Sequence, residues 1–227
     1  MVVVIGASSA LGQELLGGLC RIDQVIATFH TRDVRYKSDR LTKVRLNLAD
    51  QKAVIRFGKN LVTSQEPLTL IYLAALTLDE LVVNSSLKRW QSVFQINVES
   101  SFLILKEALP KMVADKWGRV IFVSSCVTRS GDPGTASYSA SKSALHGLSR
   151  VVSQEYGRFG VTSNVLQLGY FEKGLIDLLK KENKDKVLNR IPSRRWGGSK
   201  DIFEAIRFII RTDYLNGSVI VLDGGLA

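Results

Sequence analysis

Residues 1–12 read MVVVIGASSALG, and this stretch decides the fold of the chain. A short run of apolar, mostly β-branched residues leads into a turn that contains Gly6 and closes at Gly12. Runs of β-branched residues favour strands, whereas the apolar residues from 10 to 20 recur at the spacing of a helix. The stretch therefore predicts a strand, a glycine-containing turn and a helix at the start of the sequence.

The alternation of strand and helix continues along the chain. Strands that are apolar throughout and alternate with amphipathic helices indicate a parallel sheet covered on both faces. Residues 31–42 are mostly polar and too few for a crossover helix, so a loop or a single turn is expected there. Further strands are expected at residues 24–30, 43–48, 68–75, 119–125, 162–168 and 217–224, and helices at 51–64, 90–113, 138–157 and 200–210. We predict a single domain over residues 1–227, an α/β, doubly wound, Rossmann-type fold with a seven-stranded, mainly parallel sheet and helices on both faces.

Composition narrows the class of protein. The chain has 227 residues, of which 45% are hydrophobic, so it can bury a sizeable core without disulfides. Its two cysteines, Cys20 and Cys126, give neither a disulfide framework nor the spacing of a metal site, and they favour a reducing, cytoplasmic setting. The first residues lack the basic lead-in of a signal peptide. No apolar run reaches the ~18 residues of a membrane helix, so no membrane association is expected.

The net charge is +10, and the positive charge is concentrated in residues 32–45 and 173–200. Such segments either form a solvated surface or attract an anionic ligand or partner. Nucleic acid is not expected as a partner, because no zinc pattern, aromatic RNA-binding motif or recognition helix accompanies the charge.

The glycine-containing turn is a candidate phosphate site. In a doubly wound sheet it lies at the carboxyl end of the first strand, where ligands bind. Backbone N–H groups and the dipole of the following helix attract a pyrophosphate at such a turn. A glycine turn can also serve geometry alone, but its position as the first element of an α/β alternation favours a dinucleotide. The expected loop contacts are Gly6, Ser8, Ser9, Leu11 and Gly12.

The end of the second strand bears on the choice of cofactor. An acidic residue there would bind a ribose hydroxyl of NAD, whereas an arginine accommodates the 2′-phosphate of NADP. The strand ends in the sequence ATFHTR. His30 and Arg32 lie where the acidic residue of an NAD site would be expected, and Asp33 follows one residue later. We therefore expect NADP in preference to NAD, with the alternative that Arg32 belongs only to the solvated basic surface.

The stretch YSASK, residues 138–142, is a candidate catalytic pair. Positions i and i+4 share one face of a helix, so Tyr138 and Lys142 can meet. An ammonium beside a phenol lowers the phenol's pKa from about 10, which suits proton transfer near neutral pH. Tyr138 could also be no more than a half-buried residue at a helix start.

These features together resemble the short-chain dehydrogenase/reductase family nearly end to end. YSASK matches that family's YxxxK, and Ser125 lies at the family's spacing before Tyr138. Asn97 in FQINVES matches its helix asparagine, and NGSVIVLDGG, residues 216–225, looks like its closing strand. The resemblance implies an NAD(P)-dependent oxidoreductase that moves a hydride between the nicotinamide and a ketone or secondary alcohol.

The resemblance also implies a role for each residue. Tyr138 would donate the proton to the carbonyl oxygen, and Ser125 would hold and polarise the same oxygen. Lys142 would lower the pKa of Tyr138 and hold the nicotinamide ribose, while Asn97 would hold a water that links Lys142 to solvent. Singly, Ser125 could be a strand-end hydroxyl and Asn97 a partner of a backbone carbonyl.

The chain departs from the family's usual pattern at several cofactor positions. In the loop T-G-x-x-x-G-x-G, Ile5 replaces the Thr and Ala10 the middle Gly. A threonine that often binds the carboxamide side of the cofactor is Lys173. These changes put the affinity for cofactor in doubt more than the chemistry. Cofactor contacts are still expected at the residues in the matching positions, which are Asn47, Leu48, Ala74, Ala75 and Gly169 together with Tyr138 and Lys142.

Residues 170–198 are expected to determine the substrate, because loops at this edge of a sheet carry recognition. They predict a lid helix with an apolar face formed by Leu175, Ile176, Leu178 and Leu179 and with a basic opposite face. An amphipathic helix packed on the core would show the same pattern.

Several functions remain open at this point. Reduction of a 3-oxoacyl thioester is the best single expectation. Sugars, polyols, steroids, pterins and other biosynthetic intermediates are alternatives, and the small-molecule carbonyl substrate could be anionic or bound to a carrier protein. The resemblance implies a homodimer or homotetramer. The rival function is a dinucleotide-sensing or regulatory protein with weak or no turnover.

Overall fold

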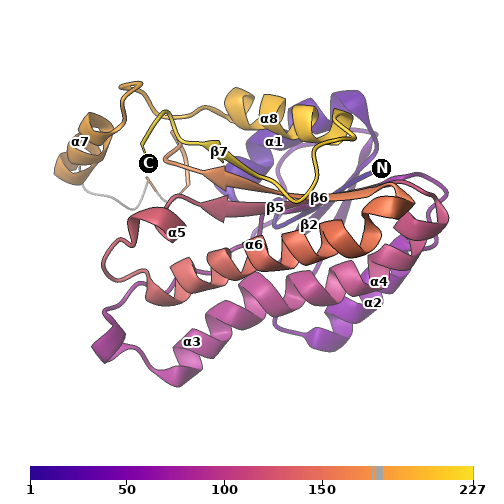
Figure 1. Cartoon of the computed structure of the whole chain (residues 1–227), viewed down its shortest axis with the longest axis horizontal. Coiled ribbons are helices and arrows are strands. Elements are labelled where there is room, and N and C mark those ends of the chain that lie inside the picture. Colours follow the sequence, from indigo (N-terminus) through magenta and orange to yellow (C-terminus); the bar gives the residue numbers. More distant parts are fainter. Residues whose placement is uncertain (175, 177–180, 227) are drawn as a thin grey trace.

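The computed structural model describes residues 1–174, 176 and 181–226. Its centre is a seven-stranded sheet in the order β3-β2-β1-β4-β5-β6-β7, in which every neighbouring pair is parallel (Figure 1). The strands are β1 (Val2–Ile5), β2 (Val25–Phe29), β3 (Leu41–Arg45), β4 (Leu68–Tyr72), β5 (Gly118–Ser125), β6 (Val161–Leu168) and β7 (Val219–Leu222). The predicted doubly wound sheet is confirmed, and it is parallel throughout rather than mainly parallel.

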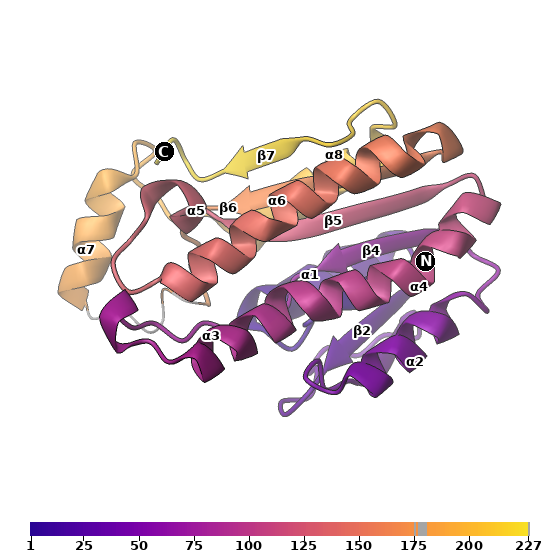
Figure 2. The same cartoon turned by 60° about the horizontal axis from the view of Figure 1, so that its bottom comes forward.

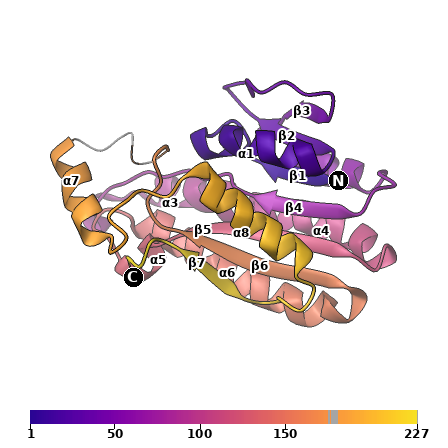
Figure 3. The same cartoon turned by 90° about the horizontal axis from the view of Figure 1, so that it is seen from above.

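Helices cover both faces of the sheet. The helices are α1 (Ala10–Ile22), α2 (Gln51–Leu61), α3 (Leu87–Phe94), α4 (Ser100–Ala114), α5 (Val127–Ser130), α6 (Ala136–Tyr156), α7 (Lys181–Arg190) and α8 (Ser199–Arg211). Helices α1 and α8 lie on one face, seen in front of the sheet in Figure 3. Helices α2, α4 and α6 run side by side over the other face (Figure 2).

Alternation along β1 shows how the sequence builds these layers. Val3 and Ile5 pack into the core beneath α2, α4 and α6, whereas Val2 and Val4 pack into the core beneath α1 and α8. All four side chains are buried because successive side chains of a strand point to opposite faces. A central strand with no polar face can only exist in a sheet that is covered on both sides.

The strand order reverses between β1 and β4, and this position decides where a ligand binds. In open parallel sheets, ligands bind outside the carboxyl ends of the strands at such a switch point. The turn after β1 and the residues after β4 meet there. Helices α5 and α7 lie beyond the same edge of the sheet (Figure 1).

The connection between β2 and β3 contains no helix, as predicted. It is a loop in which the buried side chain of Val34 packs onto the core beneath α1. Lys43 in β3 donates a hydrogen bond back to the carbonyl oxygen of Val34.

The predicted helix over residues 90–113 differs in detail. It begins three residues earlier, at Leu87, and a π-helical turn, η2 (Gln95–Glu99), separates α3 from α4. Single π-helical turns are frequent at functional sites because they re-aim a side chain. Here the side chain concerned is that of Asn97, which is fully buried.

The predicted lid segment is described only in part. Leu175, Leu178 and Leu179, which were expected on its apolar face, lie outside the described residues. Ile176 is buried, and the helix that follows is α7. None of the helices that the structure describes is both long and apolar enough to cross a bilayer.

Candidate active site

The turn after β1 is shaped by close backbone contacts. Gly6 has a φ of 89°, and a Cβ there would lie 2.6 Å from the Cα of Ala74. A Cβ on Gly12 would lie 2.7 Å from the carbonyl oxygen of Ala7. Only glycine therefore fits at both positions. Ser9 caps the following helix, because its hydroxyl accepts the backbone N–H of Gly12 at 3.1 Å.

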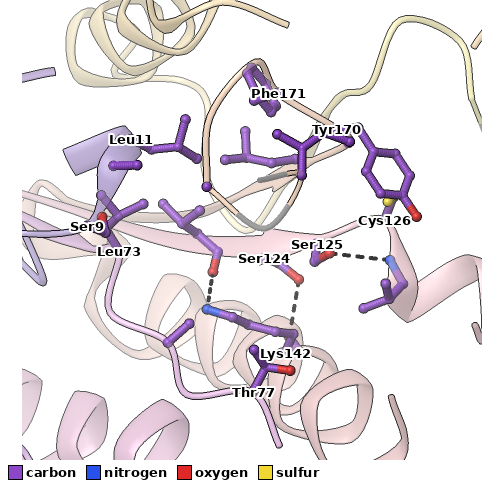
Figure 4. A pocket seen from close by; sticks show the side chains of 18 of the residues that line it. Ser9, Leu11, Leu73, Thr77, Ser124, Ser125, Cys126, Lys142, Tyr170 and Phe171 are labelled. Carbon is purple, nitrogen blue, oxygen red and sulfur yellow. Dashed lines mark hydrogen bonds between the residues drawn. The ribbon is translucent and has the colours of Figure 1, made fainter. Parts of the chain in front are cut away.

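A cleft of about 250 Å³ extends from this turn to the predicted catalytic residues (Figure 4). Its walls come from the start of α1, the ends of β4, β5 and β6, and the first turns of α6. The cleft is lined by seven of the predicted site residues, namely Ser9, Leu11, Ala75, Ser125, Tyr138, Lys142 and Gly169. Ala10, which lies in the turn between Ser9 and Leu11, lines it as well. The structure thus joins segments that lie far apart in the sequence.

The other predicted cofactor residues lie outside the lining of this cleft. Gly6 and Ala74 form the close contact beneath the turn, and Ser8 and Gly12 complete the turn itself. Leu48 packs against the core beneath α2 and α4. His30, Arg32 and Asn47 are exposed beyond the ends of β2 and β3. Their cofactor contacts stay predictions.

Ser125, Tyr138 and Lys142 meet at the centre of the cleft. Ser125 is the last residue of β5, while Tyr138 and Lys142 lie one helical turn apart in α6. Lys142 is fully buried, and its Nζ donates a hydrogen bond to the carbonyl oxygen of Val123 at 2.8 Å. The same Nζ lies 5.8 Å from the centre of the Tyr138 ring.

Burial dominates the ionisation of this pair. It raises the pKa of Tyr138 to about 12, against a hydrogen bond with Ser125 that lowers this pKa. It lowers the pKa of Lys142 to about 7. The expectation that Lys142 brings the pKa of Tyr138 below 10 is therefore wrong in this structure. Burial disfavours the charged form of each group, and the ammonium is directed at the carbonyl of Val123 rather than at the phenol oxygen.

Asn97 is held by three hydrogen bonds. Its Oδ1 accepts the backbone N–H of Leu76 at 2.7 Å, and its Nδ2 donates to the carbonyl oxygen of Leu76 at 3.0 Å and to Ser141 Oγ at 2.9 Å. The structural interpretation, in which Asn97 binds a backbone carbonyl, is confirmed. A role in holding water stays a prediction. Asn97 thus connects Leu76, in the segment after β4, with Ser141 in α6, the residue before Lys142.

The opposite end of the cleft contains residues that the sequence analysis missed. Tyr170 follows β6, and its hydroxyl donates a hydrogen bond to Asp132 Oδ2 at 3.2 Å. Its ring meets that of Trp196 edge to face, with 6.3 Å between the ring centres. Cys126, which is buried beside Ser125, also lines this end (Figure 4). Position was the only signal for Tyr170, since it begins the segment expected to recognise substrate.

Lys173 lines the cleft beside α1. Its Nζ lies 2.6 Å from the carboxylate of Glu14 in α1. The neighbouring Gly174 packs near Leu11, at the start of the same helix. The residue that replaces the family's threonine thus lies beside the glycine-containing turn.

A dinucleotide fits the residues that are present. The turn allows the backbone to approach a phosphate closely at two glycines, and the capped N-terminus of α1 directs N–H groups toward it. The cleft then continues without interruption to Ser125 and Tyr138. Among the described side chains, no group of three or more His, Cys, Asp or Glu could hold a metal ion.

Comparisons with known proteins agree with this geometry. A family model described as short chain dehydrogenase matches residues 1–185. The 3-oxoacyl-(acyl-carrier-protein) reductase FabG of Buchnera aphidicola subsp. Schizaphis graminum is 30% identical over 233 residues, which cover 99% of this chain and 96% of that protein. The FabG of Rickettsia conorii is 27% identical, with 99% and 95% covered. A crystal structure of a gluconate 5-dehydrogenase from Burkholderia cenocepacia, in complex with NADP and tartrate, has the same fold, with a TM-score of 0.88, 20% identity and coverage of 99% and 94%.

Proposed function

This chain belongs to the short chain dehydrogenase family and is an oxidoreductase acting on a ketone or secondary alcohol, and from that premise we propose that it prefers NADP and transfers the proton through Tyr138. The observation that carries the proposal is the meeting of Ser125, Tyr138 and Lys142 in one cleft that begins at a glycine-containing turn. The three side chains come from a strand end and one helix face, and they line the same cleft as the turn proposed to bind the dinucleotide. A regulatory protein would not need them there.

The chemistry follows from what each group can donate. When bound, the nicotinamide supplies the hydride. Hydride transfer to a carbonyl carbon builds negative charge on the substrate oxygen. That oxygen needs a hydrogen-bond donor to stabilise the charge and an acid to protonate it. With a pKa raised to about 12, Tyr138 keeps its proton at neutral pH and can give it to that oxygen. The Ser125 hydroxyl holds the same oxygen in place.

Lys142 stabilises the phenolate that forms when Tyr138 gives up its proton. A nearby positive charge favours the anionic form of a phenol, and the buried site strengthens that interaction. Because burial lowers the pKa of Lys142 to about 7, the ammonium is present below neutral pH and lost above it. Asn97 positions α6 against the segment after β4 through Leu76 and Ser141.

The surroundings of β2 support the preference for NADP. The carboxylate of Asp33 is engaged, because its Oδ1 accepts the backbone N–H of Val34 at 2.7 Å and its Oδ2 lies 3.6 Å from Lys43 Nζ. It is therefore poorly placed to bind a ribose hydroxyl. Arg32 is exposed beside it, and Arg45 is held at the carbonyl oxygen of His30, so a 2′-phosphate would meet positive charge.

We expect Arg32→Ala to raise the Kd of NADPH about tenfold and to leave the Kd of NADH within about twofold. A charge-assisted hydrogen bond contributes about 1.5–3 kcal/mol, and only NADPH carries the phosphate. The measurement is a fluorescence titration with each dinucleotide. Arg56→Ala, an exposed arginine on α2, is the control. Equal weakening of both dinucleotides would contradict the preference.

Exposed apolar side chains support the proposal of a homodimer or homotetramer. Phe102 on α4 and Val151 on α6 are 47% and 52% exposed, and Phe208 is exposed on α8, across the sheet from them. Val221 is exposed on the edge strand β7. Apolar residues grouped on helix faces or an edge strand mark contact surfaces.

We expect light scattering to give two or four times the 25.1 kDa mass of one chain. Val151→Asp should shift this mass toward the monomer, because a charge in a buried interface is left unpaired. Lys59→Ala, an exposed lysine on α2, should leave the mass unchanged. A wild-type protein that is monomeric at micromolar concentration would refute the assembly.

The substrate class is proposed only broadly. The names of the FabG relatives make a 3-oxoacyl thioester, free or bound to a carrier protein, one proposed class. Exposed basic residues on α7, such as Lys186 and Arg190, would suit an acidic carrier. Hydroxylated ketones form the second class, and the residues around Tyr170 favour it, as argued below.

One experiment separates the enzyme from the sensor. NADPH and NADH are titrated against the pure protein, and oxidation of each is then followed with a panel of ketones. We expect NADPH to bind and to be oxidised in the presence of at least one ketone. Tight binding without any turnover would favour the regulatory alternative, and no binding of either dinucleotide would refute both.

A further inference from the structure

The substrate end of the cleft is crossed by a chain of three side chains. Trp196 packs edge to face on Tyr170, and the Tyr170 hydroxyl donates its hydrogen bond to Asp132. Tyr170 lines the cleft directly, whereas Asp132 lies behind it. The hydroxyl of Tyr170 therefore lies at the edge of the cleft with its direction fixed by Asp132.

Asp132 is itself fixed by the turn that precedes α6. Its carbonyl oxygen accepts the backbone N–H of Thr135 at 3.2 Å and the hydroxyl of Thr135 at 2.7 Å. Gly131 and Gly134, with φ of 63° and 89°, shape this turn on either side. The same turn leads within a few residues to Tyr138. Asp132 and the proton donor Tyr138 thus lie on one short segment whose turn is closed by hydrogen bonds.

The direction of the hydrogen bond decides what Tyr170 can offer. A phenol has one proton to donate, and its oxygen can still accept. Because the proton of Tyr170 points at Asp132, a group in the cleft that reaches this oxygen meets only an acceptor. Burial and the charge of Asp132 raise the pKa of Tyr170 to about 12, so the proton remains in place at neutral pH. The positive charge of Arg190 lowers the pKa of Tyr170, but this is the smallest of the effects on it.

A second wall of the cleft repeats this arrangement. Thr77, which follows β4, also lines the cleft, and its hydroxyl donates to the carboxylate of Asp79. Because the proton of Thr77 is directed at Asp79, its hydroxyl oxygen can likewise only accept a hydrogen bond from a group in the cleft. Among the described lining residues, the two lysines are already engaged, Lys142 with the carbonyl oxygen of Val123 and Lys173 with the carboxylate of Glu14. Two walls of the cleft therefore carry an acceptor oxygen with a carboxylate behind it, despite the basic composition of the chain.

We propose that Tyr170, oriented by Asp132, is a specificity-determining residue. It selects substrates with a hydroxyl on the first or second carbon from the reacting carbonyl and disfavours those with a carboxylate there. The inference rests on the proposed function and narrows its substrate class. A hydroxyl can donate to the Tyr170 oxygen. The second carbonyl of a 3-oxoacyl thioester is an acceptor and cannot, so the arrangement favours hydroxyketones over that class.

Two matched series of ketones test the proposal with NADPH. The first comprises 1-hydroxy-2-butanone, 3-pentanone and 2-oxobutanoate, which share an ethyl ketone and differ in one small group. The second comprises 4-hydroxy-2-butanone, 2-pentanone and 3-oxobutanoate, in which that group lies one carbon further away. In at least one series we expect kcat/KM to fall from hydroxyl to alkyl to carboxylate, with about tenfold or more between the extremes.

Two variants assign this ranking to named atoms. Tyr170→Phe should reduce kcat/KM for the hydroxyketone to the level of its alkyl analogue, because the acceptor oxygen is gone. Asp132→Asn should raise the relative rate of the carboxylate at least about threefold, since it removes the negative charge and leaves the oxygen of Tyr170 in place. Tyr214→Phe, at a fully exposed tyrosine, is the matched control and should change neither ratio.

The outcomes distinguish the two levels of the proposal. Turnover without the ranking, or a ranking that survives in Tyr170→Phe, would overturn the role of Tyr170 and leave the oxidoreductase intact. No turnover of these compounds or of a 3-oxoacyl thioester with either NADPH or NADH would contradict the proposed function itself.

Discussion

Tyr138→Phe is expected to lower kcat by about 10²–10⁴-fold while the Kd of NADPH stays within about twofold. A positioned general acid contributes a factor of this size, and phenylalanine removes only the proton and the oxygen. The ring is buried in the first turns of α6, so its packing is preserved. Single-turnover oxidation of NADPH with a ketone measures the first quantity, and fluorescence titration the second.

The same measurements on Tyr214→Phe provide the control, because that tyrosine is fully exposed. A Tyr138→Phe protein with unaltered turnover would reject Tyr138 as the proton donor. A large rise in the Kd of NADPH would instead show that the phenol mainly holds the dinucleotide. Neither result could be attributed to misfolding if the circular dichroism and melting temperature of the variant match those of the wild type.

The order of elements was predictable because it depends on local patterns. Buried parallel strands such as β1 read as continuous apolar runs, and the short polar link between β2 and β3 excluded a helix. Ser125, Tyr138 and Lys142 were identified for a similar reason, since a strand end and one helical turn fix their relative positions. The glycines at 6 and 12 followed from the same logic, and the structure shows which backbone atoms they approach.

The sequence could not show the features that depend on tertiary contacts. The π-helical turn at Asn97 is visible only once Leu76 and Ser141 are placed beside it. All of α6 and all of β6 separate Tyr170 from Asp132, so no local spacing connects them. The pKa of Tyr138 was expected in the wrong direction because the sequence showed the neighbouring amine but not the depth of burial.

Lys142→Met is expected to abolish most of the activity and yet to stabilise the fold near neutral pH. Burial lowers the pKa of this lysine from 10.5 to about 7, so at pH 7 the folded protein pays on the order of 3–5 kcal/mol to keep an ammonium that the unfolded chain carries without strain. Methionine fills a similar volume without a charge. Loss of the hydrogen bond to Val123 offsets about 1 kcal/mol of the gain.

The sign of the pH dependence follows from proton linkage. Between pH 7 and 10.5 the unfolded chain binds a proton at this lysine that the folded chain does not, so the wild type gains stability from this group as the pH rises. The advantage of Lys142→Met is therefore fully present at pH 7 and below, and shrinks toward pH 10. Urea unfolding at pH 6, 7, 8 and 9 measures it, with Lys106→Met at an exposed lysine as the control.

Activity should change in the opposite sense over the same range. If the ammonium of Lys142 stabilises the phenolate of Tyr138, the rate of ketone reduction by the wild type is flat below pH 7 and falls up to tenfold per pH unit above it. In Lys142→Met the rate should be low, with this fall absent.

Two results would contradict this account. A Lys142→Met protein that is equally destabilised at pH 6 and 9 would show that burial does not disfavour the ammonium. A rate that still falls above pH 7 in this variant would assign the titration to another group. The gain in stability and the loss of activity have one physical origin, because the low-dielectric site that penalises the ammonium also strengthens its attraction for a phenolate.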